Sequence, residues 1–137
     1  MMNIYDKDDG FRQFSLHEAN VLLNAIINLT EATVQKLEAI KKELEAQRAL
    51  GHDAGAEAAF ERDSIEILEN WAREVVGIGA YPKGYFTVDF KSHIPDTLLC
   101  WTYGEQVISH THKTYETFKD RIPIDDVKMF GFEDSRN

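Results

Sequence analysis

The chain has 137 residues, of which 43% are hydrophobic and 28% are charged, and its formal net charge at pH 7 is -9. This length and balance are typical of one globular domain, here residues 1–137, with enough chain to bury a core. The negative charge argues against binding to nucleic acid or to an anionic membrane surface, because both attract basic patches.

The only cysteine, Cys100, has no partner for an internal disulfide, so the sequence does not require an oxidising compartment. Residues 1–10 contain three aspartates and no apolar run, which is not the pattern of a secretory signal. The most apolar window, residues 21–29, is interrupted by Asn24 and Asn28 and is too short to span a bilayer. We therefore expect a cytoplasmic protein.

The first predicted helix covers about residues 15–50. Ser15 and Glu18 have the spacing of a capping box, in which each side chain binds the backbone N–H of the other residue. A seven-residue repeat follows, and such a repeat keeps a seam of side chains facing a partner helix. The seam residues are Leu16, Ala19, Leu23, Ile26, Thr30, Thr33, Leu37, Ile40, Leu44 and Gln47. The flanks of the seam are apolar in its first half only, so we expect that half to contact a second neighbour.

A turn is predicted at residues 51–55, which hold two glycines, and a second helix at about residues 54–76. Apolar residues recur on one face of this helix, and Pro82 prevents its continuation. Because the turn is short, the two helices are expected to be antiparallel neighbours. The end of the second helix then lies beside the start of the first, and the rest of the chain packs there.

The sheet is predicted over about residues 84–113. Polar and apolar residues alternate in 85–90 and in 97–103, which is the pattern of strands with one buried face. The side chains predicted to face the helices are Phe86, Val88, Phe90, Leu99, Trp101 and Tyr103. Residues 107–112 are a weaker third strand that could instead be a short helix. The tail, about 122–137, is expected to pack only in part.

The predicted fold class is therefore α+β. It consists of a long antiparallel helical hairpin with a small antiparallel β-sheet packed across its open end. The alternation in the strands also decides which polar side chains lie on the sheet face turned away from the hairpin. Those side chains are Asp89, Cys100, His110 and His112.

These residues form a candidate metal site. Imidazole, thiolate and carboxylate groups together suit zinc or iron, and Glu105 follows closely enough to complete the set of ligands. The candidate ligands are Cys100, His112, His110, Glu105 and Asp89. Each residue also has an ordinary structural interpretation. Cys100 is then a small buried apolar residue, and both histidines are solvated. Asp89 caps a turn or pairs with Arg121, and Glu105 caps a short helix.

Several motifs in the chain resemble those of a known family. The opening is Phe14-x-Leu16-x-Glu18-Ala19-Asn20-x-Leu22-Leu23, and the later elements are Val88-Asp89-Phe90, Leu99-Cys100-Trp101-x-x-Gly104-Glu105, His112 and Phe118-x-x-Arg121-x-Pro123. In their order and spacing they resemble the small bacterial proteins grouped as domain of unknown function 2203, over about residues 14–124. The resemblance implies no reaction. It singles out the residues that lie in shared motifs, namely Asp89, Cys100, Glu105, His112 and Arg121.

The chain departs from this family at two positions. It has Thr111 where the family usually has tryptophan, and Phe86 where the family usually has glycine, two residues before Val-Asp-Phe. His110 has no clear counterpart in the family. The departures leave Cys100, Glu105, His112 and Arg121 in place, but they argue against a shared aromatic pocket around His112, and the lack of a counterpart for His110 weakens the two-histidine version of the metal site.

Three functions follow as hypotheses, and whether the protein is an enzyme stays open. The first is a non-enzymatic binding or interaction module with an unknown protein partner, which forms a homodimer through the outer half of its first helix. The second is a metal-binding protein or metalloenzyme with zinc or iron held around Cys100 and His112. The third is a thiol-dependent enzyme, which requires Cys100 to be exposed and reactive.

Overall fold

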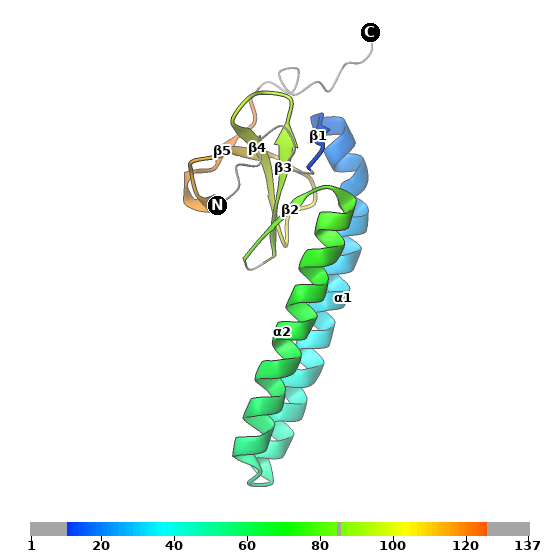
Figure 1. Ribbon diagram of the computed structural model, residues 1–137, viewed down its shortest axis with the longest axis vertical. Coiled ribbons are helices and arrows are strands. Elements are labelled where there is room, and N and C mark those ends of the chain that lie inside the picture. The colour runs from blue at the N-terminus through cyan, green and yellow to red at the C-terminus, as the bar shows by residue number, and fades with distance from the viewer. Residues whose placement is uncertain (1–10, 85, 126–137) are drawn as a thin grey trace.

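The computed structural model describes residues 11–84 and 86–125. Two long helices, α1 (Leu16–Ala49) and α2 (Asp53–Ile78), run antiparallel as a hairpin, and a sheet lies beside its open end (Figure 1). The α+β class and the hairpin predicted from the sequence are thus confirmed. The first and last residues of both helices lie within two residues of the predicted limits. In the described part of the chain, no helix is long and apolar enough to cross a membrane.

The predicted capping box forms at the start of α1. The Glu18 backbone N–H donates to Ser15 Oγ at 3.0 Å, and the Ser15 N–H donates to Glu18 Oε1 at 2.8 Å. These bonds satisfy amide groups that have no partner inside the helix, and they fix the point at which α1 begins. Beside this start, α2 ends before Gly79, whose φ of 107° is the left-handed conformation that ends a helix.

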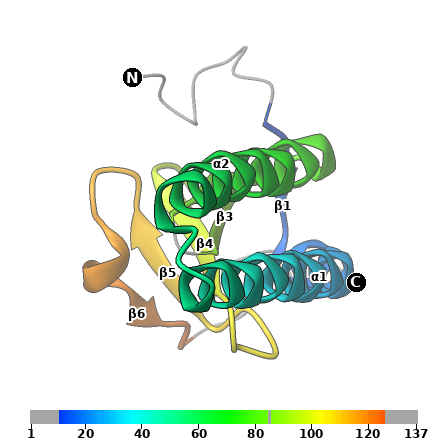
Figure 2. The same ribbon diagram turned by 90° about the horizontal axis from the view of Figure 1, so that it is seen from below.

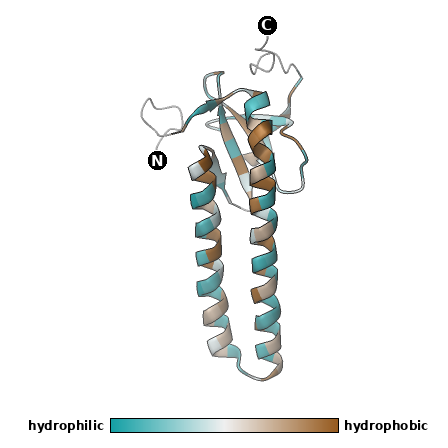
Figure 3. Ribbon diagram, turned by 90° about the vertical axis from the view of Figure 1, so that its right-hand side faces the viewer, coloured by the Kyte–Doolittle hydropathy of each residue, from teal (hydrophilic) through white to brown (hydrophobic). Residues whose placement is uncertain are grey.

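The seam of α1 faces α2, and most of the core lies toward the sheet. The buried residues of α1 are Leu16, Ala19, Leu23, Ile26, Thr30, Thr33 and Leu44. Only Leu44 in this set lies in the last third of the helix. From α2, Trp71 and Val75 are buried, and both lie in its last two turns. Figure 3 shows apolar residues concentrated where the helices meet the sheet. The first half of α1 therefore contacts two neighbours, as its apolar flanks predicted.

The sheet orders its strands β1-β3-β4-β5-β6, and β2 also pairs with β3. The strands are β1 (Gln13–Phe14), β2 (Tyr81–Lys83), β3 (Thr87–Ser92), β4 (Thr97–Thr102), β5 (His110–Lys113) and β6 (Ile122–Pro123). The β1–β3 pair is parallel and the other pairs are antiparallel. Seen along the hairpin, β5 and β6 lie to one side of both helices (Figure 2). The sheet therefore extends away from the hairpin toward its last strands.

Several details of the predicted sheet were wrong. Its limits were too narrow, because β1, β2 and β6 lie outside residues 84–113. Phe86 is a turn residue with a φ of 61° rather than part of a strand. Tyr103 follows the end of β4 and is 42% exposed, so it does not face the helices as a core residue. The third predicted strand is a strand and not a helix, but it covers His110–Lys113. Of the tail, residues 126–137 lie outside the described part.

The hairpin-facing side of the sheet is apolar, as the alternation predicted. Val88 and Phe90 of β3 pair in register with Trp101 and Leu99 of β4, and all four side chains have no exposed surface. They pack into one core cluster with residues of both helices and of β1. The Phe14 ring meets the Phe90 ring edge to face at 5.2 Å between centroids. This packing fixes the opposite face of β3 and β4 in space.

Candidate metal centre

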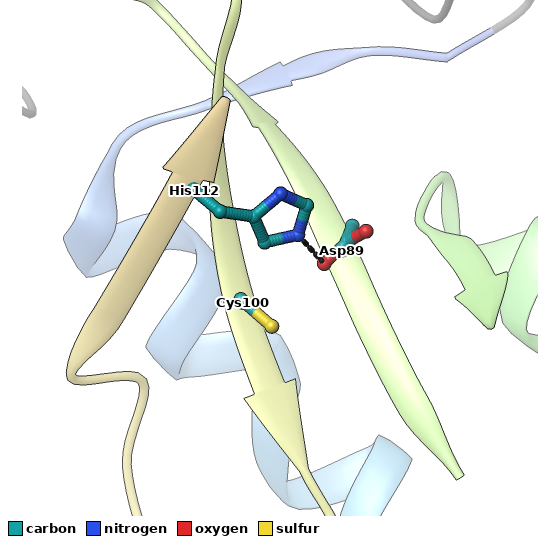
Figure 4. Close-up of side chains that lie close together, drawn as sticks. All are labelled: Asp89, Cys100 and His112. Carbon is teal, nitrogen blue, oxygen red and sulfur yellow. Dashed lines mark hydrogen bonds and ion pairs between the residues drawn. The ribbon is translucent and has the colours of Figure 1, made fainter. Parts of the chain in front are cut away.

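Three neighbouring strands bring Asp89, Cys100 and His112 together. Asp89 of β3 lies opposite Cys100 of β4, and His112 of β5 lies opposite Leu98, one step further along the same face. Because successive side chains in a strand point to opposite faces, these three lie on the side away from the core. Figure 4 shows their side chains projecting from the same face of the sheet toward one another. The sequence predicted this face correctly.

The three side chains can each offer one ligand atom to a single metal ion. These atoms all lie within 4.8 Å of one another, and His112 Nε2 is 3.1 Å from Asp89 Oδ1. A tetrahedral zinc ion with bonds of about 2.0–2.3 Å places its ligand atoms roughly 3.3–3.6 Å apart. The observed separations, up to 4.8 Å, exceed this spacing by about 1 Å at most. Asp89 and Cys100 have no exposed surface and His112 is 4% exposed, so the site is buried.

The orientation of His112 is fixed by its other ring nitrogen. Its Nδ1 lies 2.8 Å from the carbonyl oxygen of Lys113. A carbonyl oxygen only accepts, so Nδ1 carries a proton. The Asp89 carboxylate also only accepts, so its hydrogen bond with His112 needs a proton on Nε2 as well when no metal is bound. Burial works to lower the His112 pKa, but the hydrogen bond to Asp89 and the charge of Asp89 outweigh it and raise the pKa. A metal ion would displace the Nε2 proton and leave the one on Nδ1. Metal-binding histidines commonly donate their second nitrogen to a carbonyl group in this way.

Asp89 has one carboxylate oxygen in use and one without a hydrogen bond. Oδ1 meets His112, whereas the buried Oδ2 has no hydrogen-bond partner among the described residues. Lys83 Nζ lies 4.0 Å from Oδ2, beyond hydrogen-bond distance. A buried carboxylate oxygen without a partner is costly, and a metal ion is one group that would satisfy it.

Cys100 is held as a protonated thiol when no metal is bound. Burial, together with the negative charge of Asp89, raises its pKa to about 12. A metal ion that binds a cysteine removes this proton, because the thiolate is the ligand. Cys100 has no exposed surface. The structure therefore does not meet the condition set by the thiol-enzyme hypothesis, which required an exposed and reactive cysteine.

Glu105 and His110 lie outside this cluster and form a second group with Arg121. Arg121 donates to the two carboxylate oxygens of Glu105 at 3.2 and 2.8 Å, and His110 Nδ1 lies 3.8 Å from Glu105 Oε2. The predicted pairing of Asp89 with Arg121 was wrong, and so was the predicted role of Glu105 as a helix cap. Arg121 joins the two groups, because its Nη1 lies 3.9 Å from Cys100 Sγ. The guanidinium group thus lies where it can stabilise a thiolate.

The Leu-Cys-Trp-x-x-Gly-Glu motif contributes one residue to each group, Cys100 to the first and Glu105 to the second. Trp101 points into the core, and its indole N–H donates to the Glu105 carbonyl at 2.8 Å. Gly104 has a φ of 107°, which turns the chain back on itself. The Glu105 carboxylate then accepts from the Thr102 N–H at 2.9 Å and faces Arg121. Trp101 and Gly104 thereby position Glu105 beside Arg121.

A small pocket opens beside the cluster. It has a volume of about 250 Å³ and is lined by Lys83, Gly84, Thr87, Asp89, His112, Glu116, Thr117 and Phe118. Sequence reasoning missed Lys83, Glu116 and Thr117 as residues beside the cluster. Lys83 belongs to a three-residue strand too short to show alternation. The Phe118-x-x-Arg121 element was the one signal that the chain after β5 returns to the site.

The comparisons with known proteins identify a family and no function. The DUF2203 family, described as "Uncharacterized conserved protein", matches residues 12–124. This match covers most of the chain, and the chain belongs to that family. No curated protein and no solved structure matches the chain.

Proposed function

We propose that this member of the DUF2203 family is a metal-binding protein that holds zinc through Asp89, Cys100 and His112. The observation that carries the proposal is the convergence of these three buried side chains, with all their ligand atoms within 4.8 Å of one another. The hydrogen bond from His112 Nδ1 and the unpaired Asp89 Oδ2 support it.

The mixed ligand set favours zinc, with iron(II) as the other metal that it suits. One thiolate, one imidazole and one carboxylate are borderline in softness, and zinc binds all three types in tetrahedral sites. Three protein ligands leave one position open, which is the pattern of catalytic zinc sites rather than of closed structural ones. The pocket beside Asp89 and His112 lies where that position would open.

Metal analysis of the full chain tests this proposal. The protein is purified without an affinity tag or chelator, and metal content is measured in the wild type, Cys100→Ser, His112→Ala and His110→Ala. We expect about one zinc or iron per chain in the wild type and in His110→Ala, and little in the other two variants. His110 is the matched control, because it is on the same strand and face but belongs to the Arg121 group.

Added metal is also expected to stabilise the protein. At about 1,000 times its Kd, metal adds about 4 kcal/mol of stability, which raises Tm by roughly 10–20 °C in a domain of this size. Cys100→Ser should abolish this shift. No metal in any sample, together with no metal-dependent change in Tm, would show that the cluster is ordinary buried structure.

We also propose that the protein acts in the cytoplasm. Cys100 is buried beside two other ligand groups, and a reducing compartment keeps such a thiol available to metal.

A further inference from the structure

We infer that the open position of the bound metal takes a small carboxylate ligand, whose negative charge pairs with Lys83. This inference rests on the proposed metal site and identifies the class of molecule that the site binds. It follows from the size of the adjacent pocket and from the charged residues that line it, Lys83 and Glu116.

The size of the pocket limits the ligand to a small molecule. Asp89 and His112 form part of its lining, so a group in the pocket can reach the metal. The volume of about 250 Å³ lies below the usual range of about 300–1,000 Å³ for pockets that hold drug-sized ligands. It corresponds to roughly eight water molecules at about 30 Å³ each. A group of a few heavy atoms fills this volume.

The positive charge of Lys83 favours a negatively charged ligand in the pocket. A zinc ion carries two positive charges, and the Cys100 thiolate and the Asp89 carboxylate neutralise both. Lys83 Nζ lies 4.0 Å from Asp89 Oδ2 and 4.6 Å from the centre of the Tyr81 ring, and its side chain is 42% exposed. These two contacts place the ammonium group beside the pocket. When the Asp89 carboxylate binds the metal, it no longer neutralises the Lys83 ammonium group. That group can then pair with an anion in the pocket.

Glu116, on another wall of the pocket, restricts the ligand to one negative group. Its Oε1 accepts from the Lys113 N–H at 2.8 Å, which holds the carboxylate near the pocket. A second negative charge on the ligand would be repelled by Glu116. A monocarboxylate, with its charged end between the metal and Lys83, therefore fits better than a phosphate group, which carries more charge.

Cobalt(II) substitution of the full chain tests this inference. A thiolate-to-cobalt charge-transfer band reports metal binding at Cys100, and the d–d bands report the occupant of the open position. Acetate, acetamide and inorganic phosphate are titrated separately at constant ionic strength. Acetamide controls for size, because it has the shape of acetate without its charge. The same titrations are made with Lys83→Met and with Lys41→Met, a matched change at an exposed lysine on α1.

We expect acetate to shift the d–d bands saturably, phosphate to act more weakly and acetamide not to act. Lys83→Met should keep the charge-transfer band and weaken acetate binding about tenfold, while Lys41→Met leaves it unchanged. Unchanged d–d bands with acetate, tighter binding of phosphate, or equal affinities in both lysine variants would overturn the inference while the metal site stands. Absence of the charge-transfer band in the wild type would overturn the metal site and this inference with it.

Discussion

Glu105 is a partly buried carboxylate whose charge holds Arg121 beside Cys100. Burial works to raise the Glu105 pKa, but the hydrogen bonds from Arg121 and from the Thr102 N–H outweigh it and lower the pKa. A carboxyl group with a lowered pKa stabilises the folded state at pH values above its unfolded pKa, which is about 4.3 for glutamate. This contribution is lost as the pH falls through the folded pKa.

Glu105→Gln should therefore reduce stability most at neutral pH. We expect it to lower the free energy of unfolding by about 1–3 kcal/mol at pH 7 and to flatten the loss of stability on acidification below about pH 5. Urea unfolding across this pH range measures both effects. Glu57→Gln is the control, because Glu57 forms an exposed ion pair with Arg48 and such pairs contribute little. A variant with the same pH dependence as the wild type would contradict the prediction.

Phe86 explains one departure from the family at the level of a single residue. Its φ of 61° lies in the left-handed region, where glycine has no steric penalty, and the family usually has glycine here. In this chain the Phe86 ring packs edge to face on Trp71 at 5.1 Å between centroids and lies 6.3 Å from the Tyr103 ring. The aromatic contacts offset the backbone strain of roughly 1–2 kcal/mol.

At the level of elements, α1 and α2 are linked by a buried hydrogen bond. The Trp71 indole N–H donates to Thr30 Oγ1 at 2.9 Å, and the Thr30 hydroxyl donates to the Ile26 carbonyl at 2.7 Å. Thr33 donates to the Leu29 carbonyl at 2.8 Å, within its own helix. The two seam threonines thus differ, because Thr30 accepts a hydrogen bond from the neighbouring helix.

Thr30→Val should destabilise the protein more than Thr33→Val does. The change keeps the shape of the side chain but leaves the buried Trp71 N–H without a partner, which costs about 1–3 kcal/mol. Thr33→Val removes a local bond and should cost less than about 0.5 kcal/mol. Urea unfolding followed by circular dichroism compares the two variants. Equal costs, or an undiminished cost of Thr30→Val when Trp71 is replaced by Phe, would refute this role of Thr30.

The helices and the longer strands could be predicted because each repeats a pattern over many residues. The capping box at Ser15 and the seam of α1 defined the hairpin, and the alternation in β3 and β4 defined the face that holds Asp89 and Cys100. β1 and β6 have two residues each, too few to show alternation. The positions of Lys83 and Glu116 beside the cluster also depend on long-range pairing, for which one sequence gives no signal.

For the whole molecule, self-association stays a prediction, but the structure changes where it should be tested. The outer seam of α1 packs against α2 within the chain, and Leu44 is 8% exposed. Leu37→Asp or Leu44→Asp would therefore disrupt the hairpin itself. On α2, three apolar side chains stay on the surface: Ile65 is 53%, Leu68 41% and Val76 48% exposed.

We expect the wild type to sediment as a dimer and the variant with Ile65→Lys and Leu68→Lys as a folded monomer, because charged groups on this face oppose its burial. Analytical ultracentrifugation with circular dichroism measures mass and folding together. Leu50→Lys is the control, since Leu50 is 66% exposed at the turn of the hairpin. A wild-type monomer, or a dimer unaffected by the paired change, would exclude self-association through this face.

The parallel pairing of β1 with β3 sets an order of events during synthesis. β1 precedes α1, yet its partners Lys91 and Ser92 follow α2, so the whole hairpin is made before this pair can close. The hairpin depends on contacts between adjacent elements and can form early, whereas the sheet must wait for later residues. Asp89, Cys100 and His112 all belong to those later strands. The three side chains of the proposed metal site therefore cannot come together until β5 has emerged from the ribosome, so the proposal implies that metal binds late, after the sheet has formed.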